Sequence, residues 1–177
     1  RRVVRLDGVP ARLDGSGERD RFVVRHAVAL SGEGSQVGDE AFHPVESDFR
    51  ARYSLPDGPL VGYTGRHGFE KNLDLLIDAT AGLETDATLV FGGDGPARES
   101  LETHAADVGV DARFLGFLDR DELPEFYSVM DVFGFPSPVE TQGLVALEAN
   151  ACGTPVAGVK AGALGDTIDD GENGYAA

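Results

Sequence analysis

Short apolar runs alternate with amphipathic segments along the chain from Pro59 onward. These runs are bounded by glycine, proline or charged residues and are typical of buried strands. We expect strands in the segments PLVGYTG, ATLVFGG, ARFLGFL, DVFGFP and TPVAGV, which begin at residues 59, 87, 112, 131 and 154. Because strands that alternate with helices form βαβ units, the hydrophobic pattern predicts an α/β domain with a parallel sheet.

Apolar residues at helical spacing fill the segments between these runs. We expect helices over 72–80, from Asp94 and Pro96 to Val108, over 119–130 and over 142–151. Their core-facing positions should be Leu73, Leu76, Ile77 and Thr80 in the first, Leu123, Phe126, Tyr127 and Met130 in the third, and Leu144, Leu147 and Ala151 in the last. The predicted fold is therefore a Rossmann-like, doubly wound sheet. Ligands of such sheets bind beyond the carboxyl ends of the strands, which here are the loops after Thr64, Gly92, Gly116 and Pro136.

The first forty residues do not fit this pattern. Residues 1–40 hold seven of the thirteen arginines and no sustained apolar period, so we leave them unassigned, as irregular chain, a hinge or a remnant of another domain. Residues 41–177 form the predicted domain. The chain begins without Met and stops at DGENGYAA, so we expect a fragment.

Charge restricts the possible partners. The net charge of -16 and the pI near 4.4 disfavour nucleic acid and anionic membranes as general partners. The chain holds more Asp than Glu, and of its basic residues only Lys71 and Lys160 are lysines. This composition resembles proteins of salt-loving microbes, so we expect a halophilic protein; a merely acidic one is the alternative.

Cysteine usage and hydropathy indicate a cytoplasmic location. The single Cys152 excludes an intrachain disulfide and is typical of a reducing compartment. It stands among Ala, Gly and Val, where a cysteine behaves as a small buried hydrophobe rather than as a reactive thiolate. We see no apolar run of transmembrane length and no signal peptide.

Glu148 is an isolated charge in an apolar segment. It is the one charged residue between Thr141 and Val159, and it falls within the predicted core stripe of its helix. Burying an unpaired charge costs at least several kcal/mol, so Glu148 must meet hydrogen-bond donors or be protonated. Backbone groups or an arginine could supply the donors, and so could the hydroxyls of a bound sugar.

The start of the same helix is a candidate phosphate site. Glu140 precedes the segment TQGL, whose backbone N–H groups and positive dipole end favour an anion, and Gly143 permits close approach. A lone carboxylate such as Glu140 is also common at helix starts. The helix rises roughly 9 Å between Gln142 and Glu148. This spacing suits a diphosphate flanked by two polyols.

Two cations occur in the predicted loop after the first strand. Arg66 and Lys71 lie in the segment GYTGRHGFEKN and can point into the same crevice. Arginine binds phosphate in a bidentate manner, and lysine adds a compact charge. A solvated loop with a surface salt bridge to Glu70 is the alternative. His67 and Lys160 are expected on the polar surface.

Four separated segments resemble the donor-binding half of the retaining GT-B glycosyltransferases, in the large glycogen-synthase-like and mannosyltransferase-containing family 4 type. The segments are GRHGFEKNLDLLIDA, LVFGGDGPARESLE, ARFLGFLDRDELPEFYSVMDVFGFPS and ETQGLVALEANACGTPVAG. The resemblance runs from about Phe42 to Gly174 and includes two glutamates eight residues apart. It implies that this chain is the C-terminal half of a GT-B enzyme and that it is truncated before the closing C-terminal helix of the family.

The resemblance also implies roles for individual residues. Arg66 and Lys71, next to Gly65, would bind the donor diphosphate, and Glu148 would bind the ribose hydroxyls. Glu140 and the backbone of Thr141, Gln142, Gly143 and Leu144 would contact the transferred sugar and the distal phosphate. Arg66, Lys71 and Glu140 would be the catalytic residues. The family often has Gly-Phe-Gly where this chain has Thr141-Gln142-Gly143, a variant associated with lipid-directed glucosyltransferases.

The implied reaction moves a hexose from a nucleoside-diphosphate sugar to a lipid or saccharide acceptor, with retention and with assistance from the leaving diphosphate. Neither a cofactor nor a metal is expected. The acceptor domain would be N-terminal to this chain, so the fragment alone should be inactive. The full-length protein could associate peripherally with a membrane.

Other functions remain open at this stage. A nicotinamide-dependent oxidoreductase would need Gly-x-Gly-x-x-Gly after the first strand, and Gly62, Gly65 and Gly68 have the wrong spacing. A sugar-nucleotide epimerase shares the GT-B architecture but needs additional acid and base residues. A non-catalytic nucleotide-sugar-binding module is the third alternative, and product formation with a supplied acceptor domain would distinguish it.

Overall fold

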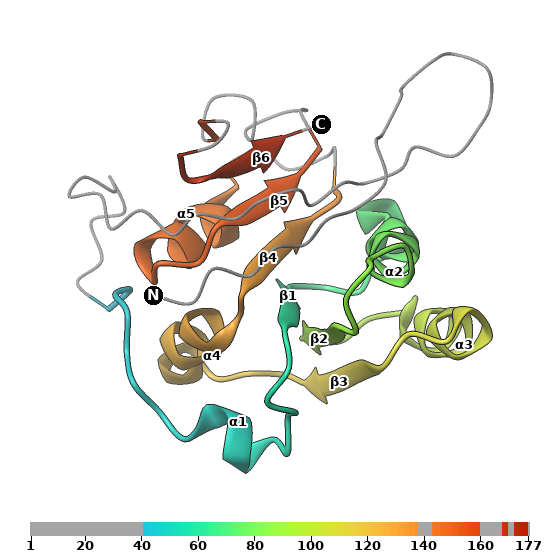
Figure 1. The fold of residues 1–177 in the computed structure, drawn as a ribbon, viewed down its shortest axis with the longest axis horizontal. Coiled ribbons are helices and arrows are strands. Elements are labelled where there is room, and N and C mark those ends of the chain that lie inside the picture. The colour runs from blue at the N-terminus through green and yellow to red at the C-terminus, as the bar shows by residue number, and fades with distance from the viewer. Residues whose placement is uncertain (1–40, 138–142, 160–167, 170–171, 177) are drawn as a thin grey trace.

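Parallel strands form the centre of the domain. The computed structural model describes residues 41–137, 143–159, 168–169 and 172–176, and among them six strands form one sheet in the order β3-β2-β1-β4-β5-β6 (Figure 1). The strands are β1 (Leu60–Thr64), β2 (Thr88–Gly92), β3 (Ala112–Gly116), β4 (Val132–Phe135), β5 (Val156–Gly158) and β6 (Gly174–Ala176). The first five lie within the predicted runs, and the predicted Rossmann-like fold is confirmed. The short β6 was not predicted.

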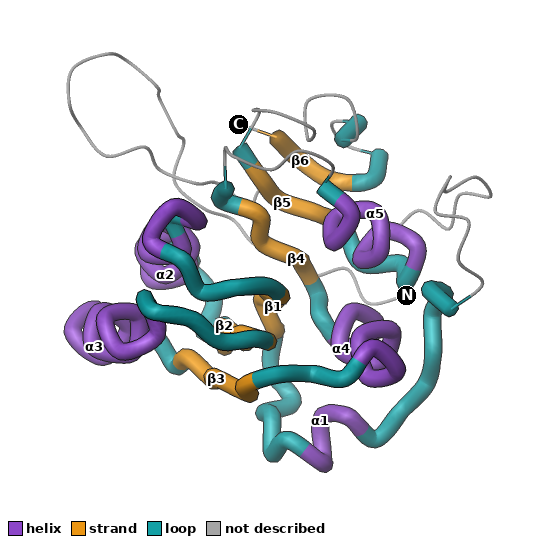
Figure 2. Tube along the Cα trace, turned by 180° about the vertical axis from the view of Figure 1, so that it is seen from behind, coloured by secondary structure: helices purple, strands orange, loops and turns teal. Residues whose placement is uncertain are grey.

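Helices cover both faces of the sheet (Figure 2). The α-helices are α1 (Phe49–Arg52), α2 (Leu73–Ala81), α3 (Arg98–Val108), α4 (Leu123–Val129) and α5 (Leu144–Ala151), and the 3₁₀ turns are η1 (Phe69–Lys71) and η2 (Arg120–Glu122). Helices α2 and α3 pack with one core cluster, whereas α1, α4 and α5 pack with the other. The sheet is thus doubly wound, as predicted.

Burial follows the expected pattern in most elements. Every residue of β1, β2 and β4 is buried, because helices cover both faces of these central strands. The predicted core stripe of α2 is buried in full, from Leu73 to Thr80. In α4 and just after it, Phe126, Tyr127 and Met130 are buried, while Leu123 packs at the margin of the cluster.

Glycines within strands let two helices approach the sheet. A Cβ at Gly62 would collide with the side chain of Met130, and one at Gly134 would collide with Leu76. The helical segments on opposite faces therefore use strand glycines as their contact points.

The predicted core stripe of α5 is wrong. Ala146 and Ala149 are the buried residues of this helix, whereas Leu144 is 53% exposed and Leu147 and Ala151 are partly buried. Helix α5 has apolar residues on two sides, and the predicted core side was the one that carries the larger leucine side chains. The structure places the alanines against the sheet, where their small size permits close packing.

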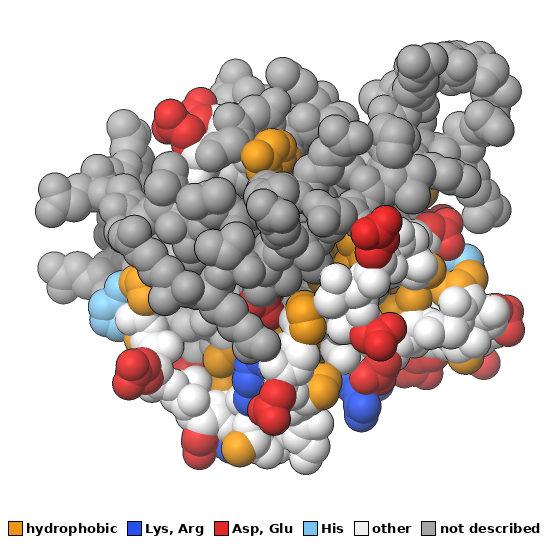
Figure 3. Space-filling view, viewed as in Figure 1, with side chains coloured by type: hydrophobic (Ala, Val, Ile, Leu, Met, Phe, Trp, Pro, Cys, Tyr) orange, Lys and Arg blue, Asp and Glu red, His pale blue; other side chains and the backbone are white. Residues whose placement is uncertain are grey.

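Acidic side chains are spread over the described surface. Figure 3 shows Asp and Glu scattered across one face rather than gathered in a single patch.

Residues 1–40, which the sequence leaves unassigned, lie outside the described residues, so the expected domain boundary at residue 41 stays a prediction.

Candidate nucleotide-binding site

The strand order places the predicted site at one point of the sheet. Strands β1 and β4 are neighbours, and the chain leaves them toward helices on opposite faces, α2 after β1 and α5 after β4. In doubly wound sheets a crevice opens beyond the carboxyl ends of the strands where the order reverses. The loop with Arg66 and Lys71 follows one of these neighbouring strands and helix α5 follows the other, so this end of the sheet is the candidate site.

In the loop after β1, Arg66 is exposed and Lys71 is half-buried. Gly65 has a φ of 141°, a conformation that favours glycine, and Lys71 ends the turn η1. Arg66 Nη1 lies 3.0 Å from Glu70 Oε1, and the two side chains are 63% and 49% exposed. The surface ion pair kept as an alternative is therefore present. An exposed pair of this kind contributes about 1 kcal/mol or less, so a phosphate can compete for the guanidinium group.

The loop after β2 fixes the loop after β1. The N–H of Gly65 donates to the carbonyl of Gly92 at 3.0 Å, and the N–H of His67 donates to the carbonyl of Asp94 at 2.9 Å. A Cβ at Gly93 would collide with the carbonyl oxygen of Gly65, and one at Gly95 would collide with the backbone of His67. The two loops therefore interlock through their backbones. The glycines of this contact lie in the segment GGDGP. The hydrophobic pattern alone indicates only that a strand ends and a helix begins in this segment.

His67 is a buried residue, and the expectation that it lies on the polar surface is wrong. Its side chain is fully buried, and its ring contacts Tyr63, Phe91 and Phe114 at centroid distances of 5.6 to 6.2 Å. Neither ring nitrogen has a hydrogen-bond partner of normal geometry among the described residues. Burial lowers the pKa of His67 below its ordinary value, and the nearby Gly92 backbone opposes this shift. The ring therefore packs as a neutral aromatic group.

Glu148 accepts a hydrogen bond from the buried core. The hydroxyl of Tyr127 donates to Glu148 Oε2 at 2.9 Å, and Thr64 Oγ1 lies 2.9 Å from the same hydroxyl. The phenol has a single O–H group, which donates its hydrogen bond to the carboxylate. In the contact between Thr64 and Tyr127, the Thr64 hydroxyl is therefore the donor. Burial, followed by the charge of Glu148, raises the pKa of Tyr127 well above its ordinary range. The helical pattern predicts Tyr127 as a core residue only and gives no sign of these contacts.

The start of α5 is described from Gly143 onward. Gly143 is buried, has a φ of 60° and precedes the first helical residue, Leu144. Its carbonyl accepts the N–H groups of Ala146 and Leu147, so the N–H groups of Leu144 and Val145 lie before the first intrahelical hydrogen bond. Glu140, Thr141 and Gln142, which the family resemblance assigns to the sugar and the distal phosphate, lie outside the described residues.

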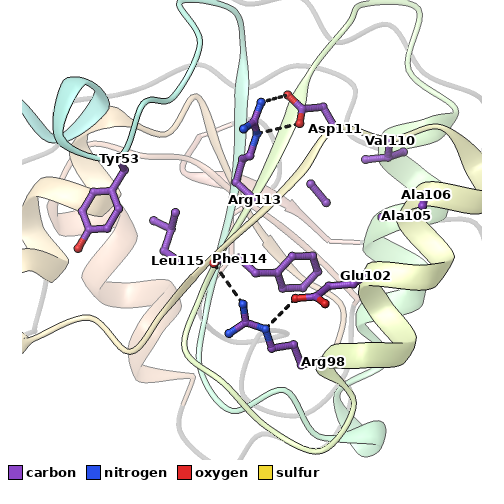
Figure 4. Close-up of a pocket in the computed structure, with 11 residues that line it drawn as sticks. Tyr53, Arg98, Glu102, Ala105, Ala106, Val110, Asp111, Arg113, Phe114 and Leu115 are labelled. Carbon is purple, nitrogen blue, oxygen red and sulfur yellow. Dashed lines mark hydrogen bonds and ion pairs between the residues drawn. The ribbon is translucent and has the colours of Figure 1, made fainter.

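A separate groove runs along the edge strand β3 (Figure 4). It has a volume of about 470 Å³, and its lining includes Arg98 and Glu102 of α3 and Arg113 of β3. Both arginines are paired, Arg98 with Glu102 at 2.8 Å and Arg113 with Asp111 at 2.8 Å. The groove lies along the outer strand rather than at the β1 and β4 ends, and its positive charges are already compensated within the protein.

Cys152 behaves as the sequence predicts. It is buried, and burial raises the pKa of its thiol to about 12, so the thiolate form is negligible at neutral pH.

Within the described residues, no three His, Cys, Asp or Glu side chains gather so that they could hold a metal ion. No helix in this part of the chain is both long enough and apolar enough to cross a membrane.

The fold defines a class of protein. A doubly wound parallel sheet whose strand order reverses between β1 and β4 is the architecture of nucleotide-binding α/β domains. The family model described as glycosyl transferases group 1 matches residues 45–177. The chain therefore belongs to this glycosyltransferase family, and the resemblance stated from the sequence is confirmed.

Individual relatives agree with this assignment. Sulfoquinovosyl transferase SQD2 of Arabidopsis thaliana is 41% identical over 142 residues, which are 78% of this chain and 27% of the relative. Sucrose-phosphate synthase of Thermosynechococcus elongatus superposes with a TM-score of 0.70 at 34% identity over 77% of this chain and 36% of that protein. HepE of Anabaena, solved in complex with UDP and glucose, gives a TM-score of 0.70 at 26% identity over 77% of this chain and 40% of HepE.

The matched proteins are longer than this chain. It spans between 27% and 40% of the length of these three relatives. The fold is the Rossmann-like nucleotide-sugar-binding fold found in GT-B glycosyltransferases.

Proposed function

We propose that this chain is the donor-binding domain of a retaining glycosyltransferase that moves a hexose from a nucleoside-diphosphate sugar to a lipid or saccharide acceptor. The carrying observation is that β1, which the Arg66–Lys71 loop follows, is the neighbour of β4, which helix α5 follows, and that hydrogen bonds through Tyr127 join Thr64 at the end of β1 to Glu148 on α5. The complex of HepE with UDP and glucose supports a nucleotide sugar as the donor. A non-catalytic binding module would share this geometry but would form no product when an acceptor domain is supplied.

Each part of the site has a role in this proposal. Arg66 and Lys71 bind the diphosphate and stabilise the charge that builds on it as the sugar leaves. The N–H groups at the start of α5, next to Gly143, bind the distal phosphate. Glu148 binds the ribose hydroxyls, and Glu140 binds the transferred sugar. Charge on the leaving diphosphate is thereby compensated by protein groups, and the proposal requires no metal.

The experiment that tests this proposal changes Glu148 to Gln. The substitution preserves side-chain size, and the amide oxygen can still accept the Tyr127 hydroxyl, so the melting temperature should change little. Loss of charge-assisted hydrogen bonds to the ribose should weaken UDP or GDP binding by about 1.5 to 3 kcal/mol per bond. Isothermal titration calorimetry and thermal melts at high salt measure both quantities.

Inorganic pyrophosphate is the matched ligand because it contains the diphosphate and lacks the ribose. Its affinity should be the same for wild type and Glu148→Gln. Equal losses for pyrophosphate and for the nucleotides would contradict the ribose role. A lowered melting temperature with unchanged nucleotide affinity would instead show that Glu148 is a structural carboxylate paired within the protein.

A further inference from the structure

Tyr127 has a hydroxyl group in the aromatic core. The residue is fully buried, and its ring meets Phe126 at 5.7 Å and Phe133 at 5.4 Å, both edge to face. A phenylalanine would fill the same space without bringing a polar atom into the interior. Because burying a hydroxyl is unfavourable unless it is hydrogen-bonded, the partners of this group explain its presence.

The hydroxyl joins the two sides of the candidate site. Thr64, the last residue of β1, donates to Tyr127, and Tyr127 donates to Glu148 on α5. The next residue after Thr64 is Gly65, where the loop with Arg66 begins. A relay of two 2.9 Å hydrogen bonds therefore runs from the last residue of β1, next to the loop with Arg66, to the Glu148 carboxylate on α5.

The position of this hydroxyl is fixed from several directions. The edge-to-face contacts hold the ring, and the carbonyl of Tyr127 accepts the hydroxyl of Thr154 at 2.6 Å. Thr154 in turn donates its N–H to Ala149 of α5, so the backbone of α4 is tied to the same helix that carries Glu148. The raised pKa of Tyr127 keeps the phenol protonated, and it remains a donor throughout the neutral pH range.

We propose that Tyr127 is a positioning residue, which holds the Glu148 carboxylate in register with the end of β1 so that it can receive the ribose. This inference rests on the proposed function, since it presumes that Glu148 contacts the nucleotide. The phenol acts through Glu148 and does not touch the donor. A carboxylate held by a rigid neighbour loses less conformational freedom on binding, and the ligand is therefore bound more tightly.

The test is Tyr127→Phe, which removes one oxygen atom and retains the ring. UDP affinity, measured by calorimetry on the 177-residue chain, should fall roughly five- to thirty-fold, while pyrophosphate affinity should stay within twofold. Tyr53→Phe is the matched control. Its hydroxyl also donates to a glutamate, Glu122 Oε1 of η2, at 2.9 Å, but Tyr53 is the residue after α1 and lies outside the candidate site. Its removal should leave both affinities unchanged.

A double variant separates positioning from a general structural effect. If Tyr127 acts through Glu148, adding Tyr127→Phe to Glu148→Gln should weaken UDP binding by less than about twofold beyond Glu148→Gln alone. Thr64→Val removes the other hydrogen bond of the relay and should give a smaller, UDP-specific loss, which Thr64→Ser restores. These variants test the relay even if Tyr127→Phe is too unstable to measure.

The possible outcomes distinguish this inference from the proposed function. Unchanged UDP affinity in Tyr127→Phe, with a loss in Glu148→Gln, would overturn the positioning role and leave the proposed function intact. Equal losses of UDP and pyrophosphate in Tyr127→Phe, or additive losses in the double variant, would show a structural role only. No UDP binding by the wild type, or no effect of Glu148→Gln, would overturn the ribose role and this inference with it.

Discussion

At the residue scale, His67 shows how the interior supports an exposed loop. Its neighbours Arg66 and Gly68 belong to the candidate diphosphate loop, yet its own ring fills a space between Tyr63, Phe91 and Phe114. The N–H of Ala97 donates to its carbonyl at 2.9 Å, so both ring and backbone attach the loop to the β2–α3 connection. Three charged groups influence the pKa of the ring: Asp94 and Glu102 raise it, and Arg98 lowers it.

This burial predicts a pH dependence of stability. The pKa of His67 is lowered in the folded state, so the unfolded chain binds the proton more readily. The neutral ring contributes fully to the free energy of unfolding above its ordinary pKa of 6.5. This contribution is lost as the pH falls below 6.5 toward the lower pKa of the folded state. His67→Phe removes this titration while keeping a ring of similar size.

The measurement compares wild type with His67→Phe in thermal or urea unfolding from about pH 8 to about pH 5. Wild type should lose stability relative to the variant below about pH 6.5, and the difference should be constant above about pH 7. Subtracting the two curves cancels the titration of the carboxylates that both proteins share. A difference that does not depend on pH would contradict the neutral buried state of His67.

At the element scale, the connections after β1 and β2 act as one unit. Gly93 has a φ of 106°, and a Cβ there would meet the carbonyl of Gly65, which is backbone and cannot turn aside. Gly93→Ala should therefore destabilise the chain by about 1 to 3 kcal/mol and weaken nucleotide binding as the Arg66 loop is displaced. Urea unfolding and calorimetry with UDP test both effects.

Gly109 provides the matched control. It also has a positive φ, 77°, but nothing lies within 4 Å of the place where its Cβ would be. Gly109→Ala should thus show the backbone penalty alone, roughly 1 to 2 kcal/mol, and leave UDP affinity unchanged. Equal effects of the two variants on UDP binding would contradict the interlock.

The elements also show how far the sequence could predict this fold. Five strands were predictable because each lies in a short apolar run with glycine, proline or charged residues at its ends, and four of the five are fully buried. Strand β6 is three residues long and has no such run. Helix α5 has apolar residues on two stripes, and only contact with the sheet decides that Ala146 and Ala149 are buried.

The candidate site was predictable to a similar degree. Arg66, Lys71 and Glu148 stood out because cations are rare in an acidic chain and charges are rare in its apolar segment. The Thr64–Tyr127 contact joins residues 63 positions apart, and no local pattern indicates such a pair. The buried state of His67 depends likewise on three strands that are separated in the sequence.

At the scale of the whole molecule, the net charge of -16 opposes the binding of an anionic donor. The Debye length is about 8 Å at physiological ionic strength and roughly 3 Å at 1 M salt, so distant carboxylates are screened. Arg66 and Lys71 are among the groups that the proposed site places within that distance of the diphosphate. An acidic chain can therefore bind a diphosphate locally, and the repulsion from distant carboxylates weakens as the ionic strength rises.

Donor binding and sugar transfer should be separable in this chain. The chain spans 27% to 40% of the three relatives, and the ends of β1 and β4 supply groups for the donor alone in the proposed site. We therefore expect the 177-residue chain to bind UDP or GDP and to transfer no sugar, because transfer also requires an acceptor held against the anomeric carbon. Binding is measured by calorimetry with both nucleotides. Transfer is measured with radiolabelled UDP-glucose and GDP-mannose in the presence of lipid and saccharide acceptors.

Supplying an acceptor domain from a relative should produce transfer, and a Glu148→Gln chain in the same mixture should produce less. Sustained transfer by the chain alone would show that the acceptor site lies within these residues, whereas binding without transfer in the presence of an acceptor domain would favour a non-catalytic module.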